Sequence, residues 1–116
     1  MRHRVKGKIL DRKSGPRAAL MRGLATSLVI YEKIQTTEAK AKAIKPIVEK
    51  YITASKKNDL ATRRKLLGFF YWENAVKKML EVIGPRYKDR KGGYTRILKL
   101  GTRPGDRAKI VQLELV

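Results

Sequence analysis

Positive charge is the feature that most constrains how this chain folds. Its 116 residues hold 29 lysines and arginines against 10 aspartates and glutamates, a formal net charge of +19. Self-repulsion of that size opposes compaction, but 42% of the residues are hydrophobic, so the composition is not that of a disordered chain. The length fits one domain with one modest core. A pI near 10.6 predicts a polyanionic partner, above all a nucleic acid.

The basic residues concentrate in two blocks. Residues 1–24 carry eight basic side chains against one acid, and residues 86–109 carry nine against two. The centre, residues 25–85, is better mixed, with twelve against six. Two strongly basic blocks on either side of a less basic centre predict two regions of contact with a polyanion, rather than one uniformly charged and solvated surface.

The first block predicts an extended basic arm over residues 1–13. Val5, Ile9 and Leu10 are its only large hydrophobic residues, too few to hold it against a core. We expect the arm to order against phosphates. Its candidate RNA-binding residues are Arg2, His3, Arg4, Lys6, Lys8, Arg12 and Lys13.

Residues 14–116 predict a single α+β globular domain that ends in a β-hairpin. Hydrophobic residues at helical spacing indicate four helices, over residues 14–32, from about 37 onward, over 58–67 and over 73–83. Alternation indicates strands over residues 31–36, 94–100 and 108–116, with a turn over 101–107. The expected fold is two-layered, with a small mixed sheet of about three strands covered by the helices.

Capping and helix-breaking residues set the expected helix ends. Ser14 is the expected cap of the first helix, with Pro16 in its first turn, and Thr36 or Thr37 that of the second. Asn58-Asp59 caps the third helix. Pro46 should kink the second helix or force a restart. Gly84-Pro85 should end the fourth helix by a left-handed glycine followed by proline.

Catalysis is not expected from these residues. The chain has no cysteine and one histidine, which excludes cysteine-ligated metals, thiolate nucleophiles and a serine–histidine triad. It has no glycine-rich phosphate loop, and its few carboxylates are scattered. The longest hydrophobic stretches fall far short of the ~20 residues that span a bilayer. We therefore expect no enzyme activity, no cofactor, no metal, no small-molecule substrate and no membrane partner.

The segment GPRYKDRKGGYTRILK, residues 84–99, is the strongest candidate for RNA contact. Arginine bridges phosphates and lysine neutralises them, tyrosine rings stack on unpaired bases, and the glycine pair permits positive φ. The candidates here are Arg86, Tyr87, Lys88, Arg90, Lys91, Gly92, Gly93, Tyr94, Arg96 and Lys99. The alternative is a charged turn before an edge strand, with Tyr94 in the core. Further candidates on the globular face are Arg17, Arg22, Arg63 and Arg64.

The aromatic run Phe69-Phe70-Tyr71-Trp72 has three possible roles. Two of its rings can fill the core between the third and fourth helices, or the run can contact another protein or stack on bases. Consecutive residues cannot all face inward, so at least one ring should stay partly exposed.

Three stretches resemble one known family, the seventeenth protein of the bacterial-type large ribosomal subunit. They are the opening MRHR with its basic arm, IQTTEAKAKAI followed by YITASKK, and GPRYKDRKGGYTRILKLG with the ending ELV. The resemblance implies a helix–strand–three-helices–two-strands order. It also implies a structural role in the large subunit in the cytoplasm, contact with large-subunit ribosomal RNA and neighbouring ribosomal proteins, and a position near the polypeptide exit tunnel. From the residues alone, a free-standing nucleic-acid-binding regulator remains an alternative, as does a cationic protein acting on membranes or polyanionic polymers.

Overall fold

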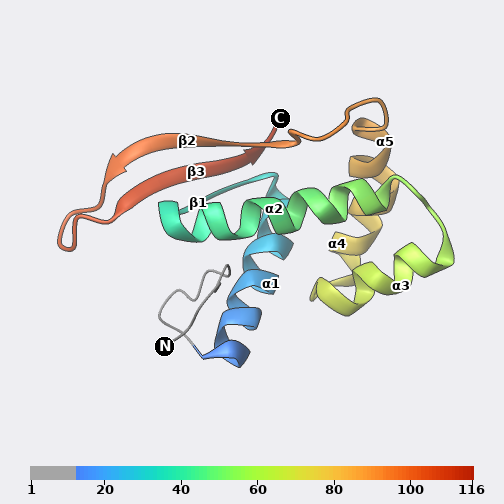
Figure 1. Cartoon of the computed structure of the whole chain (residues 1–116), viewed down its shortest axis with the longest axis horizontal. Coiled ribbons are helices and arrows are strands. Elements are labelled where there is room, and N and C mark those ends of the chain that lie inside the picture. The colour runs from blue at the N-terminus through green and yellow to red at the C-terminus, as the bar shows by residue number, and fades with distance from the viewer. Residues whose placement is uncertain (1–12) are drawn as a thin grey trace, which may run out of the picture.

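The computed structural model describes residues 13–116 and has the predicted α+β fold. Its elements, in chain order, are α1 (Ser14–Tyr31), β1 (Lys33–Thr37), α2 (Glu38–Ser55), α3 (Leu60–Phe69), α4 (Glu73–Lys78), the π-helical turn η1 (Met79–Ile83), α5 (Gly84–Arg86), β2 (Thr95–Thr102) and β3 (Lys109–Leu115) (Figure 1). Because α4, η1 and α5 follow without a break, the described chain has the expected order of helix, strand, three helices and two strands. The predicted arm, apart from Lys13, lies outside the described residues.

The three strands form one antiparallel sheet in the order β1–β3–β2. The expected mixed sheet is therefore wrong: β2 and β3 form a hairpin, and β1 pairs antiparallel on the other side of β3. Register alternates side chains between the two faces. Ile34, Leu113 and Ile97 lie in one cross-strand row, and Lys33, Glu114 and Arg96 lie in the next. The first row belongs to the core and the second faces outward.

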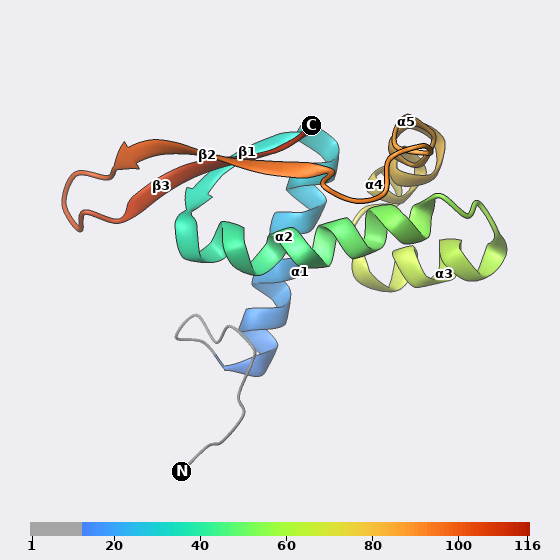
Figure 2. The same cartoon turned by 45° about the horizontal axis from the view of Figure 1, so that its top comes forward.

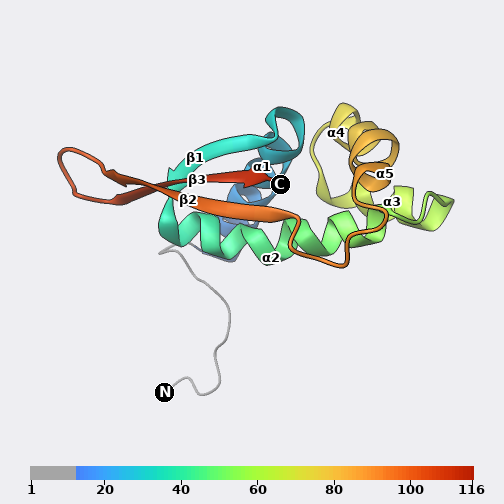
Figure 3. The ribbon, with the colours of Figure 1, turned by 90° about the horizontal axis from the view of Figure 1, so that it is seen from above.

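Helices cover one face of the sheet. In Figures 1 and 3 the sheet lies over α1 and α2, while α3 and the α4–α5 rod pack beyond the end of the sheet. The core between the layers includes Leu28, Ile44, Val48, Ile83 and Leu113, all fully buried. Figure 2 shows the β2–β3 hairpin extending past the helices to its turn.

One of the expected helix N-caps differs in the structure. The cap of α1 is Lys13, and Ser14 is already helical, because the helix extends one residue further toward the N-terminus than the Ser-Gly-Pro pattern predicts. Asp59 caps α3 as predicted, and its carboxylate accepts the amide hydrogen of Thr62 at 2.8 Å. Asx caps of this kind satisfy an otherwise unpaired helix-terminal amide.

α2 runs through Pro46 as one helix, so the predicted restart does not occur. Pro46 is exposed, whereas Ile44 and Val48 on either side of it are fully buried. Burial of these two neighbours in the same core holds both halves of the helix in line. Tertiary packing here outweighs the helix hydrogen bond that proline cannot make.

Gly84 does not end the fourth helix, contrary to the prediction. Its φ of −55° and ψ of −54° are right-handed helical, and its amide donates to Met79 O five residues back. The helix continues to Arg86. A Cβ on Gly84 would lie 2.7 Å from the carbonyl oxygen of Ser55. At Gly84, the continuous helix formed by α4, η1 and α5 therefore crosses the end of α2 in backbone contact.

Candidate nucleic-acid interface

Several of the cations predicted to bind RNA have partners within the protein. Arg22, expected to reach outward, turns toward the aromatic run. Its Nε donates to Phe69 O at 2.6 Å, and its guanidinium lies 4.4 Å from the centre of the Tyr71 ring. Both contacts join α1 to the segment between α3 and α4. These contacts give the Arg22 side chain a structural role within the fold.

Arg86 takes part in a three-residue ion cluster. Its guanidinium donates to the Glu32 carboxylate, and Lys78 Nζ lies 3.0 Å from the other Glu32 oxygen. Lys78 also donates to Ile30 O at 2.9 Å. The hydrogen bond from Arg86 lowers the pKa of Glu32 to about 2, with Lys78 adding to the effect against the opposing effect of desolvation. The cluster fastens the turn between α1 and β1 to the fourth helix.

Tyr87 and Tyr94, both predicted to contact RNA, are core residues. Tyr87 is 4% exposed and Tyr94 is 1% exposed, with ring centres 5.2 Å apart. The Tyr87 hydroxyl donates to Val116 O at 2.6 Å, and the Tyr94 hydroxyl donates to Arg90 O at 3.2 Å. Neither ring is exposed enough to stack on a base. Tyr94 therefore lies in the core, which was the alternative considered for it from the sequence.

The loop between these tyrosines has two exposed lysines, Lys88 and Lys91, whose side-chain amino groups form no ion pair or hydrogen bond within residues 13–116. Gly92 and Gly93 have φ values of 104° and 62°, the positive region that the sequence predicted. The turn brings Gly93 O within 3.2 Å of Arg90 Nε, and Arg90 O accepts from Lys56 Nζ. Arg90 is thus part of the turn, while both lysines are exposed to solvent.

The remaining predicted residues divide in the same way. Arg96 pairs with Glu114 across the hairpin at 2.8 Å, and Arg63 lies 3.9 Å from Glu73. Arg64 and Lys99 are exposed, and neither forms an ion pair within the described part of the chain. Lys13 is exposed at the start of α1, and Arg17 is half-buried one turn later. Arg2, His3, Arg4, Lys6, Lys8 and Arg12 lie outside the described residues.

The aromatic run is divided between core and surface, as predicted. Phe70 is buried, and Phe69 stacks on Tyr51 with ring centres 4.4 Å apart. Tyr71 and Trp72 are about half exposed, at 48% and 54%. Two rings therefore fill the core between the helices and two remain on the surface.

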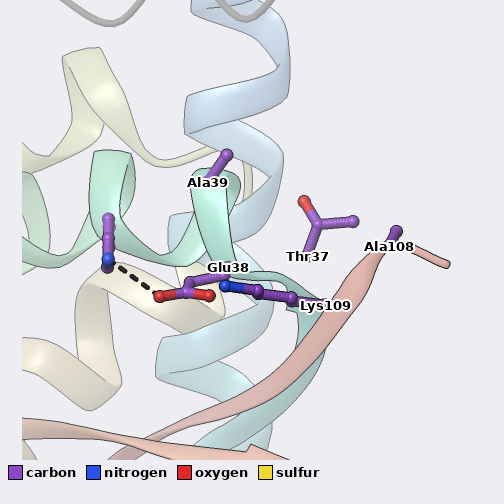
Figure 4. Close-up of a pocket in the computed structure, with 6 residues that line it drawn as sticks. Thr37, Glu38, Ala39, Ala108 and Lys109 are labelled. Atoms are coloured by element: carbon purple, nitrogen blue, oxygen red, sulfur yellow. Dashed lines mark ion pairs between the residues drawn. The ribbon is translucent and has the colours of Figure 1, made fainter. Parts of the chain in front are cut away.

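A pocket of about 520 Å³ lies between the start of α2 and the end of the hairpin. Figure 4 shows Lys109 of β3 pointing toward Glu38, whose carboxylate forms an ion pair with Lys42 at 2.8 Å. The hydrogen bond from Lys42 lowers the pKa of Glu38, so the carboxylate is charged. An acid at the centre of this pocket makes it a poor phosphate site.

The sequence reasoning missed a second, more basic depression, here named the α2–α3 groove. It encloses about 360 Å³ between the end of α2 and the start of α3, and is lined by Lys50, Thr53, Ala54, Lys57, Ala61, Thr62 and Lys65. The signal was present as spacing, because residues 50, 53, 54 and 57 recur at helical intervals on one face. Lys65 comes from a different helix, so periodicity within one helix could not add it.

The described residues contain no group of three or more acidic or histidine side chains placed to hold a metal ion. None of the described helices is both long enough and apolar enough to cross a bilayer.

Comparison with known proteins gives one consistent family. The family model for ribosomal protein L17 matches residues 20–116. Proteins named large ribosomal subunit protein bL17 align along nearly the whole chain. That of Hydrogenobaculum sp. (strain Y04AAS1) is 49% identical, with 100% of this chain and 99% of the relative covered. That of Exiguobacterium sp. (strain ATCC BAA-1283 / AT1b) is 52% identical, covering 92% and 96%. That of Dehalococcoides mccartyi (strain ATCC BAA-2100 / JCM 16839 / KCTC 5957 / BAV1) is 48% identical, covering 100% and 99%. With matches of this extent, the chain belongs to the ribosomal protein L17 family.

Proposed function

We propose that this protein is a structural, non-catalytic component of the large ribosomal subunit that binds and stabilises large-subunit ribosomal RNA. In this role it works in the cytoplasm as part of the ribosome, beside other large-subunit proteins and near the polypeptide exit tunnel. Family membership supports the ribosomal assignment. The surface charge supports RNA as the partner.

Uncompensated charge is the observation that carries the proposal. If all 10 carboxylates were paired, 19 of the 29 basic side chains would still lack an acidic partner. Six ion pairs join residues 13–116, and one carboxylate, that of Glu32, serves two of them. An RNA backbone supplies the missing negative charge at high density, and binding releases its condensed counterions.

The surface favours phosphate contact over base reading. The exposed cations Lys88, Lys91, Arg64 and Lys99 come from a loop, a helix and a strand, with no single helix presenting them as a row. Tyr87 and Tyr94, the two tyrosines predicted to contact RNA, are buried. Folded RNA is recognised chiefly through shape, 2′-hydroxyls and phosphates, which suits scattered cations on a rigid domain.

Salt dependence tests the RNA-binding part of the proposal. The full-length protein should bind large-subunit ribosomal RNA with an affinity that falls linearly in a plot of log K against log salt. For ~6–10 phosphate contacts at roughly 0.7–0.9 per contact, the slope is about −4 to −9. Filter binding from 50 to 400 mM KCl measures it, and a flat response contradicts the proposal.

Recovery with ribosomes separates this function from a free-standing regulator. A structural component should be found in purified large subunits of its source organism at about one copy per particle, and it should resist washing at moderate salt. A regulator would be found mainly in the free pool. Crosslinking within those subunits, with the attached nucleotides and proteins identified, tests the position near the exit tunnel.

A further inference from the structure

We propose that the α2–α3 groove is a binding site for an RNA phosphodiester backbone, read without regard to base sequence. The inference rests on the proposed function and adds the site and the mode of contact. The residues that carry it, Lys50, Lys57 and Lys65, were not among the cations that the sequence singled out.

The groove brings together three lysines from two elements. Lys50 lies on α2, Lys57 follows directly after the end of α2, and Lys65 lies on α3. All three are exposed, and no ion pair or hydrogen bond within residues 13–116 engages their amino groups. Three ammonium groups around one depression repel each other in the free protein, so an anion placed among them relieves an existing cost.

The other polar groups at the groove already have partners. Thr53 Oγ1 donates to Glu49 O at 3.1 Å and lies 3.2 Å from the Tyr94 hydroxyl. Asp59, beside the groove, accepts from the Thr62 amide, and this contact lowers the pKa of Asp59. That carboxylate is therefore charged but committed to capping α3. Glu38 lines the pocket beside the hairpin, whereas no acidic residue is among the described residues that line the α2–α3 groove.

The lining residues also indicate what kind of ligand fits. Lysine acts on phosphate as a flexible point charge, without the fixed fork through which arginine selects a geometry. Among the described residues, those that line the groove include no aromatic residue and no arginine, so they offer no surface for stacking on bases. These residues suit a run of phosphates whose bases point away, which is contact with the backbone alone.

The surrounding helices hold the groove in shape. Ser55, between Lys50 and Lys57, is 1% exposed and lies against Gly84 in backbone contact. Lys56, in the same segment, is held by the fold: it donates to Arg90 O and lies 4.9 Å from the centre of the Tyr94 ring. Asp59 fixes the start of α3. With both walls fixed, little ordering entropy remains to be lost when RNA binds.

The test compares three full-length variants with the wild type, on large-subunit ribosomal RNA and on an unrelated duplex RNA. The groove variant is Lys50→Gln, Lys57→Gln and Lys65→Gln. The control carries Lys33→Gln, Lys40→Gln and Lys77→Gln, which removes the same charge from lysines that also have no ion pair among the described residues. A third variant replaces the three groove lysines by arginine. Circular dichroism confirms that each variant folds.

We expect the groove variant to lose about 2–3 units of the salt slope, or roughly 100- to 1,000-fold in affinity at 0.1 M salt, equally on both RNAs. The control should lose less than about 10-fold, and the arginine variant should retain binding. Equal losses in groove and control variants overturn the inference. So does a groove variant that binds RNA normally but fails to enter the large subunit, because that result places an acidic protein in the groove. If the wild type itself shows no salt-dependent RNA binding, the proposed function fails, and not only the site.

Discussion

Replacing Gly84 by alanine should destabilise the protein, although alanine is the better helix former. Its dihedral angles suit any residue, and helix propensity alone would favour alanine by about 1 kcal/mol. The new Cβ, however, would lie 2.7 Å from Ser55 O, 3.1 Å from Met79 O and 3.2 Å from Ser55 C. All three are backbone atoms, so a rotamer change cannot relieve the overlap.

The size of the effect follows from the distance. Ordinary contact begins near 3.4 Å, so α2 and the fourth helix would have to separate by several tenths of an ångström along a packed interface. Overpacking of this kind costs about 1–3 kcal/mol, and more where little can shift. Because all three close atoms belong to the backbone, we take the upper end of that range, about 3 kcal/mol; less the propensity gain of about 1 kcal/mol, the expected net loss is about 2 kcal/mol in the free energy of unfolding.

Gly68→Ala is the matched control. Gly68 is also helical, in α3, but a Cβ there would meet nothing within 4 Å. The control should gain about 0.5–1 kcal/mol from propensity. Urea unfolding followed by circular dichroism at 25 °C measures both variants, each referred to the wild type. If Gly84→Ala matches or exceeds the wild type in stability, the close crossing of the two helices is wrong.

Two further predictions concern Glu32, the ion-pair partner of Arg86, and Tyr94, which the sequence assigned to RNA binding. Glu32→Gln should lower stability by about 1 kcal/mol at pH 7, a modest value because the Glu32 ion pairs are more than a third exposed and solvent screens them. The folded-state pKa of Glu32 is about 2 against an ordinary 4.5, so its contribution is complete above pH 4.5 and is lost as pH falls toward 2. Urea unfolding at pH 7 and pH 2.5 should show the difference between variant and wild type shrinking, and a difference independent of pH would refute the ion-pair explanation. Tyr94→Phe should cost about 1 kcal/mol of stability through its lost hydrogen bonds while leaving RNA affinity unchanged, because the ring is buried. If the variant binds RNA more weakly while its stability is unchanged, the prediction is wrong and Tyr94 contacts RNA.

The sequence predicted the helices and strands better than the contacts that basic side chains make within the fold. Strong periodicity and an Asx cap locate a helix from residues close together in the chain, which is why α3 begins where Asp59 indicates. The role of a basic side chain depends on its distant neighbours. Arg86 meets Glu32 across 54 residues and Arg22 meets Phe69 across 47, so neither contact could be read from local spacing.

The predicted helix end at Gly84 and the predicted exposure of Tyr87 and Tyr94 were wrong for the same reason, because both depend on residues distant in the sequence. Gly84-Pro85 has the composition of a helix end, but a neighbouring helix required glycine there for close approach, and the helix continued. Tyr87 and Tyr94 alternate with cations as stacking residues would, yet their hydroxyls reach Val116 O and Arg90 O inside the fold. Local chemistry permits both outcomes, and only the packing of the whole chain selects one.

The strand order β1–β3–β2 has a consequence for the protein before it meets its partner. Within residues 13–116 it makes β1 and β2 the edge strands of the sheet, and the outward amides and carbonyls of an edge strand can pair with a strand from another copy. β1 has only five residues, while β2 is interrupted by a bulge between Lys99 and Gly101 and also carries Arg96. Short, bent or positively charged borders make poor templates for such pairing. Pairing between the sheets of two copies is thus disfavoured at both edges.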